Sequence, residues 1–97
     1  MKDMPFDDVI VGCFREDPEL AIAFLNTVLA EGSQAELLIA MRQLTKAFGG
    51  VAQIAEQAGL NQTQMYRTLS SDGNPTLSNL MSILHAMGLR LAVQAVK

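Results

Sequence analysis

The chain has 97 residues, of which 49% are hydrophobic, and a formal net charge of −3. The length suits a single domain over residues 1–97. The apolar runs are too short for a membrane span, and a single cysteine cannot form an intramolecular disulfide. With no signal-peptide pattern at its start, the sequence predicts a soluble, cytoplasmic protein.

The charge is unevenly distributed along the chain. Residues 1–40 carry eight acidic and two basic side chains, a balance of −6, whereas residues 41–97 carry two acidic and five basic ones, a balance of +3. Such asymmetry suggests two surfaces for two kinds of partner, and the alternative is a solvated acidic face without a partner.

The N-terminal third, residues 1–32, is predicted to be an acidic segment followed by a helix. Residues 6–16 are ambiguous between helix and strand, and their possible caps favour a helix. Asp17 is a good N-cap for the next helix, with Pro18 at its first position. Apolar side chains recur every four residues in this helix, which predicts a buried stripe. Gly32 is expected to end the helix in a left-handed conformation. That stripe comprises Leu20, Phe24 and Val28, with Leu25 and Leu29 beside it.

Residues 33–88 are predicted to hold four more helices. Ser33 and Glu36 have the spacing of a capping box, and the helix that they begin ends at Gly49 and Gly50. Short helices are expected over residues 51–58 and 62–70, and Thr76 caps the last one, which stops at Gly88. The predicted core positions of the first and last of these helices are Leu37, Met41, Leu44 and Phe48, and Leu77, Leu80, Leu84 and Met87.

The hydrophobic period then changes. Apolar and other side chains alternate in residues 89–96, which predicts a short C-terminal β-strand. A strand needs a partner for its backbone, and two are open: residues near 6–11, or the same strand of a second subunit.

The two short helices are predicted to form a helix-turn-helix. Two helices that cross closely need a small side chain at the crossing, and the turn needs a residue with positive φ. Ala55 and Gly59 supply these at the right spacing. Helix 51–58 would then be the scaffold helix and 62–70 the recognition helix.

The recognition helix carries an unusual row of amides and hydroxyls. If Met65 and Leu69 face inward, this row faces solvent near the helix N-terminus, where base edges are contacted in the major groove. Glutamine can pair with adenine, arginine with guanine, and a threonine methyl group can meet that of thymine. The residues predicted to read bases are Gln62, Thr63, Gln64 and Arg67.

Exposed glutamines on a helix are more often a solvated face, so this prediction depends on the surrounding elements. Their order is the five-helix layout of a lambda-repressor-like domain, which gives a mainly α fold class with a short C-terminal strand. The chain moreover resembles the probable addiction-module antidote proteins, HigA-like antitoxins also called DNA-binding prophage proteins. The resemblance covers about residues 17–95, and is carried by "FLNTVLAEG", "GGVAQIAEQAGLNQTQMYRTLS", "DGNPTLSNL" and "AMGLRLAV".

The resemblance implies an antitoxin and transcriptional repressor that neutralises a basic RelE/ParE-like toxin and, as a homodimer, binds double-stranded DNA at its own operator. By position it also implies phosphate contacts from Gln53, Asn61, Tyr66, Ser71 and Asn74. Two alternatives remain: an orphan phage-type transcriptional regulator, or a toxin-binding module whose helix-turn-helix is only a scaffold. Thr68 stands where many such motifs bury an aliphatic residue, which leaves the rotation of the helix open between Gln64 and Arg67.

No pattern for an enzyme, a cofactor or a metal site is found in the sequence. His85 lacks companion ligands at metal-binding spacing, and Gly49-Gly50 lacks the lysine of a phosphate-binding loop. Cys13, beside Val11 and Phe14, is expected to be a buried small hydrophobic residue.

Overall fold

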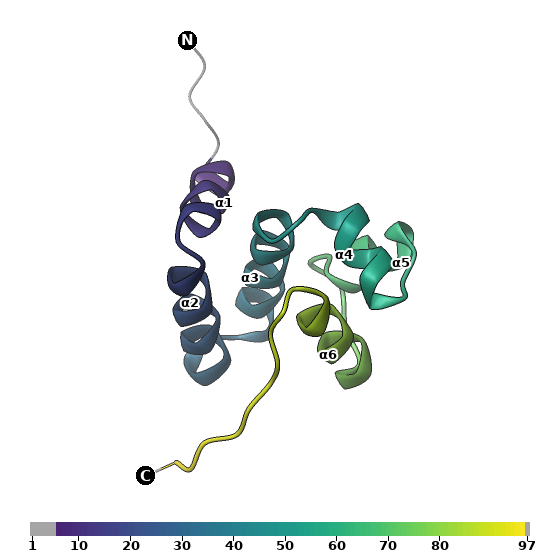
Figure 1. Ribbon diagram of the computed structural model, residues 1–97. Coiled ribbons are helices and arrows are strands. Elements are labelled where there is room, and N and C mark those ends of the chain that lie inside the picture. The colour runs from purple at the N-terminus through teal and green to yellow at the C-terminus, as the bar shows by residue number, and fades with distance from the viewer. Residues whose placement is uncertain (1–5, 97) are drawn as a thin grey trace.

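The computed structural model describes residues 6–96, and this part of the chain contains six α-helices joined by short connections (Figure 1). The five helices predicted after residue 17 are present, and the ambiguous segment before them is also helical, as favoured. The helices are α1 (Phe6–Glu16), α2 (Pro18–Glu31), α3 (Gln34–Ala47), α4 (Val51–Ala58), α5 (Gln62–Thr68) and α6 (Leu77–Ala86).

Side-chain caps define where most of these helices begin. The Asp17 carboxylate accepts a hydrogen bond from the Leu20 N–H at 3.3 Å, and the Thr76 hydroxyl accepts one from the Asn79 N–H at 3.0 Å. Ser33 and Glu36 form the predicted capping box at the start of α3. Each cap satisfies a backbone donor that has no partner within the helix, so the local sequence fixes these boundaries.

The end of α2 differs from the prediction. Gly32 has φ −87° and ψ 169°, which is extended backbone and not the expected left-handed conformation. A Cβ at this position would lie 2.8 Å from the Val28 carbonyl oxygen. Glycine is therefore required here because a side chain would collide with the end of α2, and not because the backbone adopts a positive φ.

The predicted core faces of α2 and α6 are partly wrong. On α2 the buried residues are Ala21, Leu25 and Val28, whereas Leu20 and Phe24 are 47% and 37% exposed. The Phe24 ring packs on Phe14 of α1, with 5.3 Å between ring centroids, so α1 covers one flank of α2 and shifts its buried face. On α6 the core side chains are Ile83, Leu84 and Met87; Leu80 is half-buried and Leu77 is 66% exposed.

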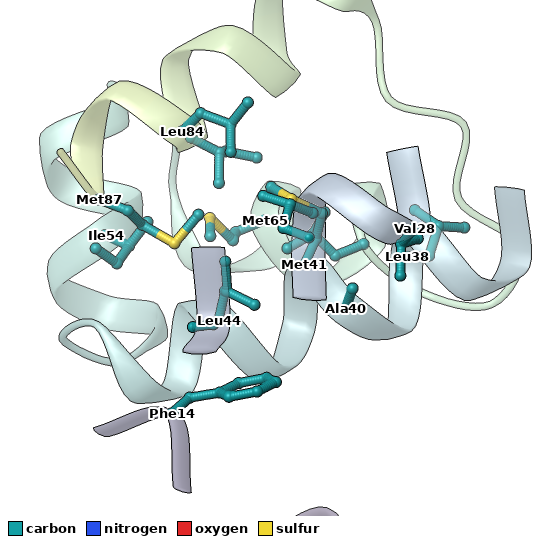
Figure 2. Close-up of a cluster of buried hydrophobic side chains, with 14 of the residues drawn as sticks. Phe14, Val28, Leu38, Ala40, Met41, Leu44, Ile54, Met65, Leu84 and Met87 are labelled. Atoms are coloured by element: carbon teal, nitrogen blue, oxygen red, sulfur yellow. The ribbon is translucent and has the colours of Figure 1, made fainter. Parts of the chain in front are cut away.

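Helix α3 lies in the middle of the molecule. It contacts α1 and α2 on one side and α4 on the other, and α4 in turn packs against α5 and α6 (Figure 1). Three methionines, Met41 of α3, Met65 of α5 and Met87 just after α6, converge in the core beside Ile54 and Leu84 (Figure 2). Flexible thioether side chains fill the irregular space where several short helices meet.

The C-terminal residues 89–96 form neither helix nor strand in the described chain. The predicted strand is therefore not observed. Pairing with residues 6–11, one of the two partners considered, is ruled out because those residues belong to α1. In Figure 1 this segment leaves the end of α6 and runs away from it as an extended arm.

Candidate nucleic-acid interface

Helices α4 and α5 are joined by a tight turn that depends on two small residues. Ala55 is 1% exposed and sits with Ile54 in the core. Gly59 has φ 76° and ψ 24°, the left-handed conformation predicted for it. The Leu60 N–H donates to the Ala55 carbonyl at 2.9 Å, a bond typical of glycine-terminated helices. The chain thus turns within three residues, and α5 packs against α4.

Asn61 is the N-cap of α5, as its residue type and position in the sequence indicate. Sequence reasoning missed that Gln64 completes a second capping box with it. The Asn61 Oδ1 accepts from the Gln64 N–H at 2.7 Å, and the Gln64 Oε1 accepts from the Asn61 N–H at 3.0 Å. The Asn-x-x-Gln spacing is the available signal for it. The Gln64 side chain is therefore engaged in structure, and only its amide Nε2 group is free for another contact.

Burial defines the rotation of α5. Met65 and Leu69 are 1% and 3% exposed, while the four residues predicted to read bases are all exposed. Successive helix residues are separated by about 100°. Thr63 and Arg67 consequently point away from the buried side, and Gln64 lies beside them. Gln62 lies closer to Met65 around the helix and is exposed because it is the first residue of α5. Between Gln64 and Arg67, the geometry places Arg67 farther outward.

An arginine from α3 holds the other end of α5, and sequence reasoning did not single it out. The Arg42 Nη1 group donates to the carbonyl of Leu69, the residue that caps α5. Its guanidinium carries charge to a helix C-terminus, where carbonyl groups lack partners. Arg42, Lys46 and Tyr66 also line a small hollow between α3, α4 and α5. The available sequence signal is an arginine directly after the core position Met41, but spacing alone does not name its partner.

The five residues implied as phosphate contacts are exposed, and they are distributed over α4, α5 and the turn that follows α5. Two of them already make intramolecular hydrogen bonds. Asn61 is engaged in the capping box, and the Asn74 Oδ1 accepts from Gln34 Nε2 at 3.4 Å. Gln53 and Tyr66 lie on α4 and α5, and Ser71 lies in the turn, all with their side chains toward solvent.

Two polar side chains of α1, Arg15 and Asp7, bind α3. The Arg15 Nη2 group donates to the Lys46 carbonyl at 3.0 Å. The Asp7 carboxylate accepts from Gln43 Nε2 at 2.9 Å and from Lys46 Nζ at 3.1 Å. The hydrogen bond from Gln43, with Lys46 adding to it, holds the pKa of Asp7 below its ordinary value of 3.8. Gln43 is 6% exposed, and its Oε1 atom has no hydrogen-bond partner among the described residues.

Other reactive side chains are dispersed. Cys13 is exposed, so the expectation of a buried residue was wrong; it faces outward on α1 while Val11 and Phe14 face inward. His85 is also exposed. Within residues 6–96, no three His, Cys, Asp or Glu side chains lie close enough to hold a metal ion. Among the same residues, no helix has the length and apolar character needed to cross a bilayer.

Comparison with known proteins identifies the family. A family described as "probable addiction module antidote protein" matches residues 8–95, nearly the whole chain. The chain belongs to this antidote family. A protein of Haemophilus influenzae, described as uncharacterized, is 34% identical over 71 residues, which is 73% of this chain and 72% of that protein. No solved structure matches the chain. Membership of the antidote family implies a toxin as a partner, as the sequence resemblance did.

Proposed function

We propose that this chain is the antitoxin of a two-component toxin–antitoxin module, and that it represses its own operon by binding DNA through α4 and α5. The antidote family supports the first part. One observation supports the second: α5 lies on α4 across a glycine turn, with its buried side fixed by Met65 and Leu69 and its polar side entirely exposed. That is the arrangement a helix-turn-helix requires.

The outward face of α5 has the chemistry of base recognition. Arg67 can donate two hydrogen bonds to guanine, and the Thr63 methyl group beside it can contact a thymine methyl group. Gln62 has both atoms of its amide free for adenine. Gln64 contributes only its Nε2 group, because its oxygen is engaged at Asn61. We therefore assign most of the sequence readout to Gln62, Thr63 and Arg67.

Affinity for DNA depends strongly on the neutralisation of phosphates, and this face has few cations. Arg67 is the one basic residue of α5, and both Arg42 and Lys46 nearby already bind within the protein. A single subunit would therefore bind DNA weakly. A homodimer doubles the contacts, and its operator would be a palindrome with half-sites about 34 Å apart.

The toxin is proposed to bind the acidic half of the molecule. On α2, Leu20 and Phe24 lie one helical turn apart and remain partly exposed, so they offer apolar area for a partner. Exposed carboxylates surround the helix at both ends. This combination suits a basic partner of the RelE/ParE-like type. Asp8, Glu16, Glu19 and Glu31 are the acidic residues of α1 and α2 that are not used as caps or in the Asp7 ion pair.

The test is a series of gel shifts with the DNA upstream of the gene, with and without the product of the neighbouring gene. We expect a shift by the chain alone, a change of that shift when the toxin is added, and rescue of growth when both proteins are expressed together. Scrambled DNA of the same length is the control. The proposal assigns no catalytic activity to the chain and places it in the cytoplasm, where its DNA is.

Two other outcomes would each replace part of this function. If the chain rescues growth from the toxin but binds no upstream DNA fragment, α4 and α5 are only a scaffold for toxin binding. The low positive charge of α5 would then explain the lack of DNA binding. Binding to DNA without any toxin gene in the neighbourhood would indicate an orphan regulator.

A further inference from the structure

The C-terminal residues 89–96 are extended, yet almost nothing binds their backbone. The Leu89 N–H donates to the Leu84 carbonyl at 2.9 Å. Among the described residues, no hydrogen bond involves the main chain of residues 90–96. Peptide groups in an extended segment with apolar side chains normally find partners in a sheet. The segment follows an extended course in Figure 1, and its main chain beyond Leu89 has no neighbour among the described residues.

The side chains of the segment divide into an anchored start and an exposed end. Leu89 and Leu91 pack against the hydrophobic core, which fixes the direction in which the segment leaves the body. Beyond them, Val93 and Val96 are 98% and 96% exposed. β-Branched residues favour strands because they pack well on a pleated surface, and here they have no surface to pack on.

A partner within the described chain is excluded. Residues 6–96 contain no strand, and residues 6–11, the segment with suitable composition, are helical. Since residues 6–96 offer no neighbour, we consider one from another molecule.

We propose that residues 89–96 pair with the same residues of a second copy to form an antiparallel two-stranded ribbon. This inference rests on the dimer of the proposed function and states how it is built. Charge favours a second copy over the toxin, because residues 89–96 contain Arg90 and no acid and would repel a basic protein.

Charge also determines the direction of pairing. A parallel ribbon in register would place Arg90 opposite Arg90, and like charges directly opposite destabilise a sheet. An antiparallel ribbon centred on Val93 places Arg90 opposite Val96 and separates the two arginines by about 20 Å along the ribbon. Its two-fold axis would relate the two α5 helices, as a palindromic operator requires.

The first test is a proline series in the full-length chain, measured by sedimentation equilibrium without DNA or toxin. Residues 92–95 are all exposed, so single prolines there leave the helical fold unchanged, which circular dichroism checks. In a two-stranded ribbon, every second N–H points to the partner. Of these four positions, two alternate ones should therefore direct their N–H groups to the partner. Proline at either of them should weaken the dimer about 10- to 100-fold, because it removes two symmetry-related hydrogen bonds. Proline at the other two positions should change the dimer little.

A second test uses disulfide formation. Cys13→Ser removes the native thiol, and a single cysteine is then placed at position 92, 93 or 94. A two-fold antiparallel ribbon pairs one residue with its own copy, so one of the three variants should cross-link readily while Glu19→Cys, an exposed site on α2, should not.

These outcomes separate the inference from the proposed function. A chain that is monomeric at every concentration, a dimer that no proline weakens, or an effect without alternation along the segment would overturn the ribbon. So would dimers that form only when toxin is present. Failure to bind DNA, in contrast, would overturn the proposed operator binding and leave the sedimentation result standing.

Discussion

At the scale of single residues, Asn61 and Gln64 show that polar side chains at the start of the proposed recognition helix can stabilise the fold. Their reciprocal hydrogen bonds satisfy two backbone donors at the start of α5. Both residues are exposed, so exposure alone does not separate them from Gln62, whose side chain makes no hydrogen bond within the described residues. Only the hydrogen bonds separate the two groups.

This difference predicts effects of different size on stability for two similar substitutions. Asn61→Ala should lower the free energy of unfolding by about 1 kcal/mol, because it removes the N-cap of α5. Gln62→Ala is the matched control, and should change stability by less than about 0.5 kcal/mol. Urea denaturation followed by circular dichroism measures both. Equal stability of the two variants would show that the capping box contributes little in solution.

In the proposed function, Arg67 is the residue on which base recognition depends most. Arg67→Ala should weaken binding to the operator by about 1–3 kcal/mol and relax sequence preference at one position in each half-site. Fluorescence anisotropy with wild-type and singly substituted operators measures both effects. Arg15→Ala, which removes the same charge from α1 together with one hydrogen bond to the Lys46 carbonyl, is the control for charge. A uniform loss across all DNA sequences would assign Arg67 to a phosphate instead of a base.

At the scale of elements, the turn between α4 and α5 depends on the backbone of one residue. Gly59→Ala should cost about 1–2 kcal/mol of stability, because φ of 76° is strained for any residue with a Cβ, although the space around it is open. Gly12→Ala, inside α1 and also in open space, should instead stabilise by about 0.5–1 kcal/mol. Thermal and urea denaturation of the two variants measures these changes in stability. Because neither new methyl group meets a neighbouring atom, the difference between the variants reports the effect of backbone conformation.

The elements themselves follow from local sequence more reliably than their buried faces do. The caps at Asp17, Ser33 and Thr76 and the left-handed Gly59 are local chemistry, and the sequence predicts each of them. The face of α2 is decided by α1, whose Phe14 contacts Phe24, and no pattern within α2 reveals that neighbour. Arg42 reaches Leu69 across 27 positions of sequence, and its partner depends on how α3 and α5 pack. The strand predicted at residues 89–96 is not formed within the described chain, and in the proposed ribbon it would depend on a second copy.

The docking of α1 on α3 should depend on pH. Asp7→Ala should cost about 1–2 kcal/mol at neutral pH, since it breaks a partly exposed ion pair and leaves the buried Gln43 amide without a partner. The pKa of Asp7 is lower in the folded state, so its contribution is complete above the unfolded value of 3.8 and is lost as the pH falls through the folded pKa.

Urea denaturation of the wild type and of Asp7→Ala at pH 7 and at pH 3 or below checks this prediction. The difference between them should shrink at acid pH. Glu36, whose pKa is also lowered, by hydrogen bonds from Ser33, titrates in both proteins and cancels in the comparison. Asp8→Ala, on the same helix and exposed, is the control. A constant difference across this range would mean that Asp7 acts by packing and not by charge.

At the scale of the whole molecule, α3 separates two surfaces of different charge. The acidic helices α1 and α2 lie on one side of it, and α4 with α5 lies on the other (Figure 1). Side chains of α3 bind both: Gln43 and Lys46 hold Asp7, and Arg42 holds the end of α5. The net charge of −3 therefore does not describe the surface that DNA would meet. It is an average over two faces.

This separation predicts how DNA binding responds to salt. The logarithm of the association constant falls by about 0.9 per phosphate neutralised when plotted against the logarithm of salt concentration. Each subunit offers Arg67 freely, and Arg42 and Lys46 only if they leave their present partners. A dimer should accordingly show a slope between about −2 and −5, smaller in magnitude than that of a repressor with many basic contacts.

Titration of operator binding between low and physiological salt, with scrambled DNA in parallel, measures this slope. A slope near −2 would mean that Arg42 and Lys46 stay bound to Leu69 and Asp7 in the complex. A steeper slope that Lys46→Gln reduces by about 2 in the dimer would mean that DNA draws Lys46 away from Asp7. DNA binding would then loosen the contact that holds α1 on α3, at the edge of the surface proposed for the toxin. A slope of zero would contradict DNA binding itself, because a protein that contacts base edges also lies against the phosphate backbone and neutralises some of its charge.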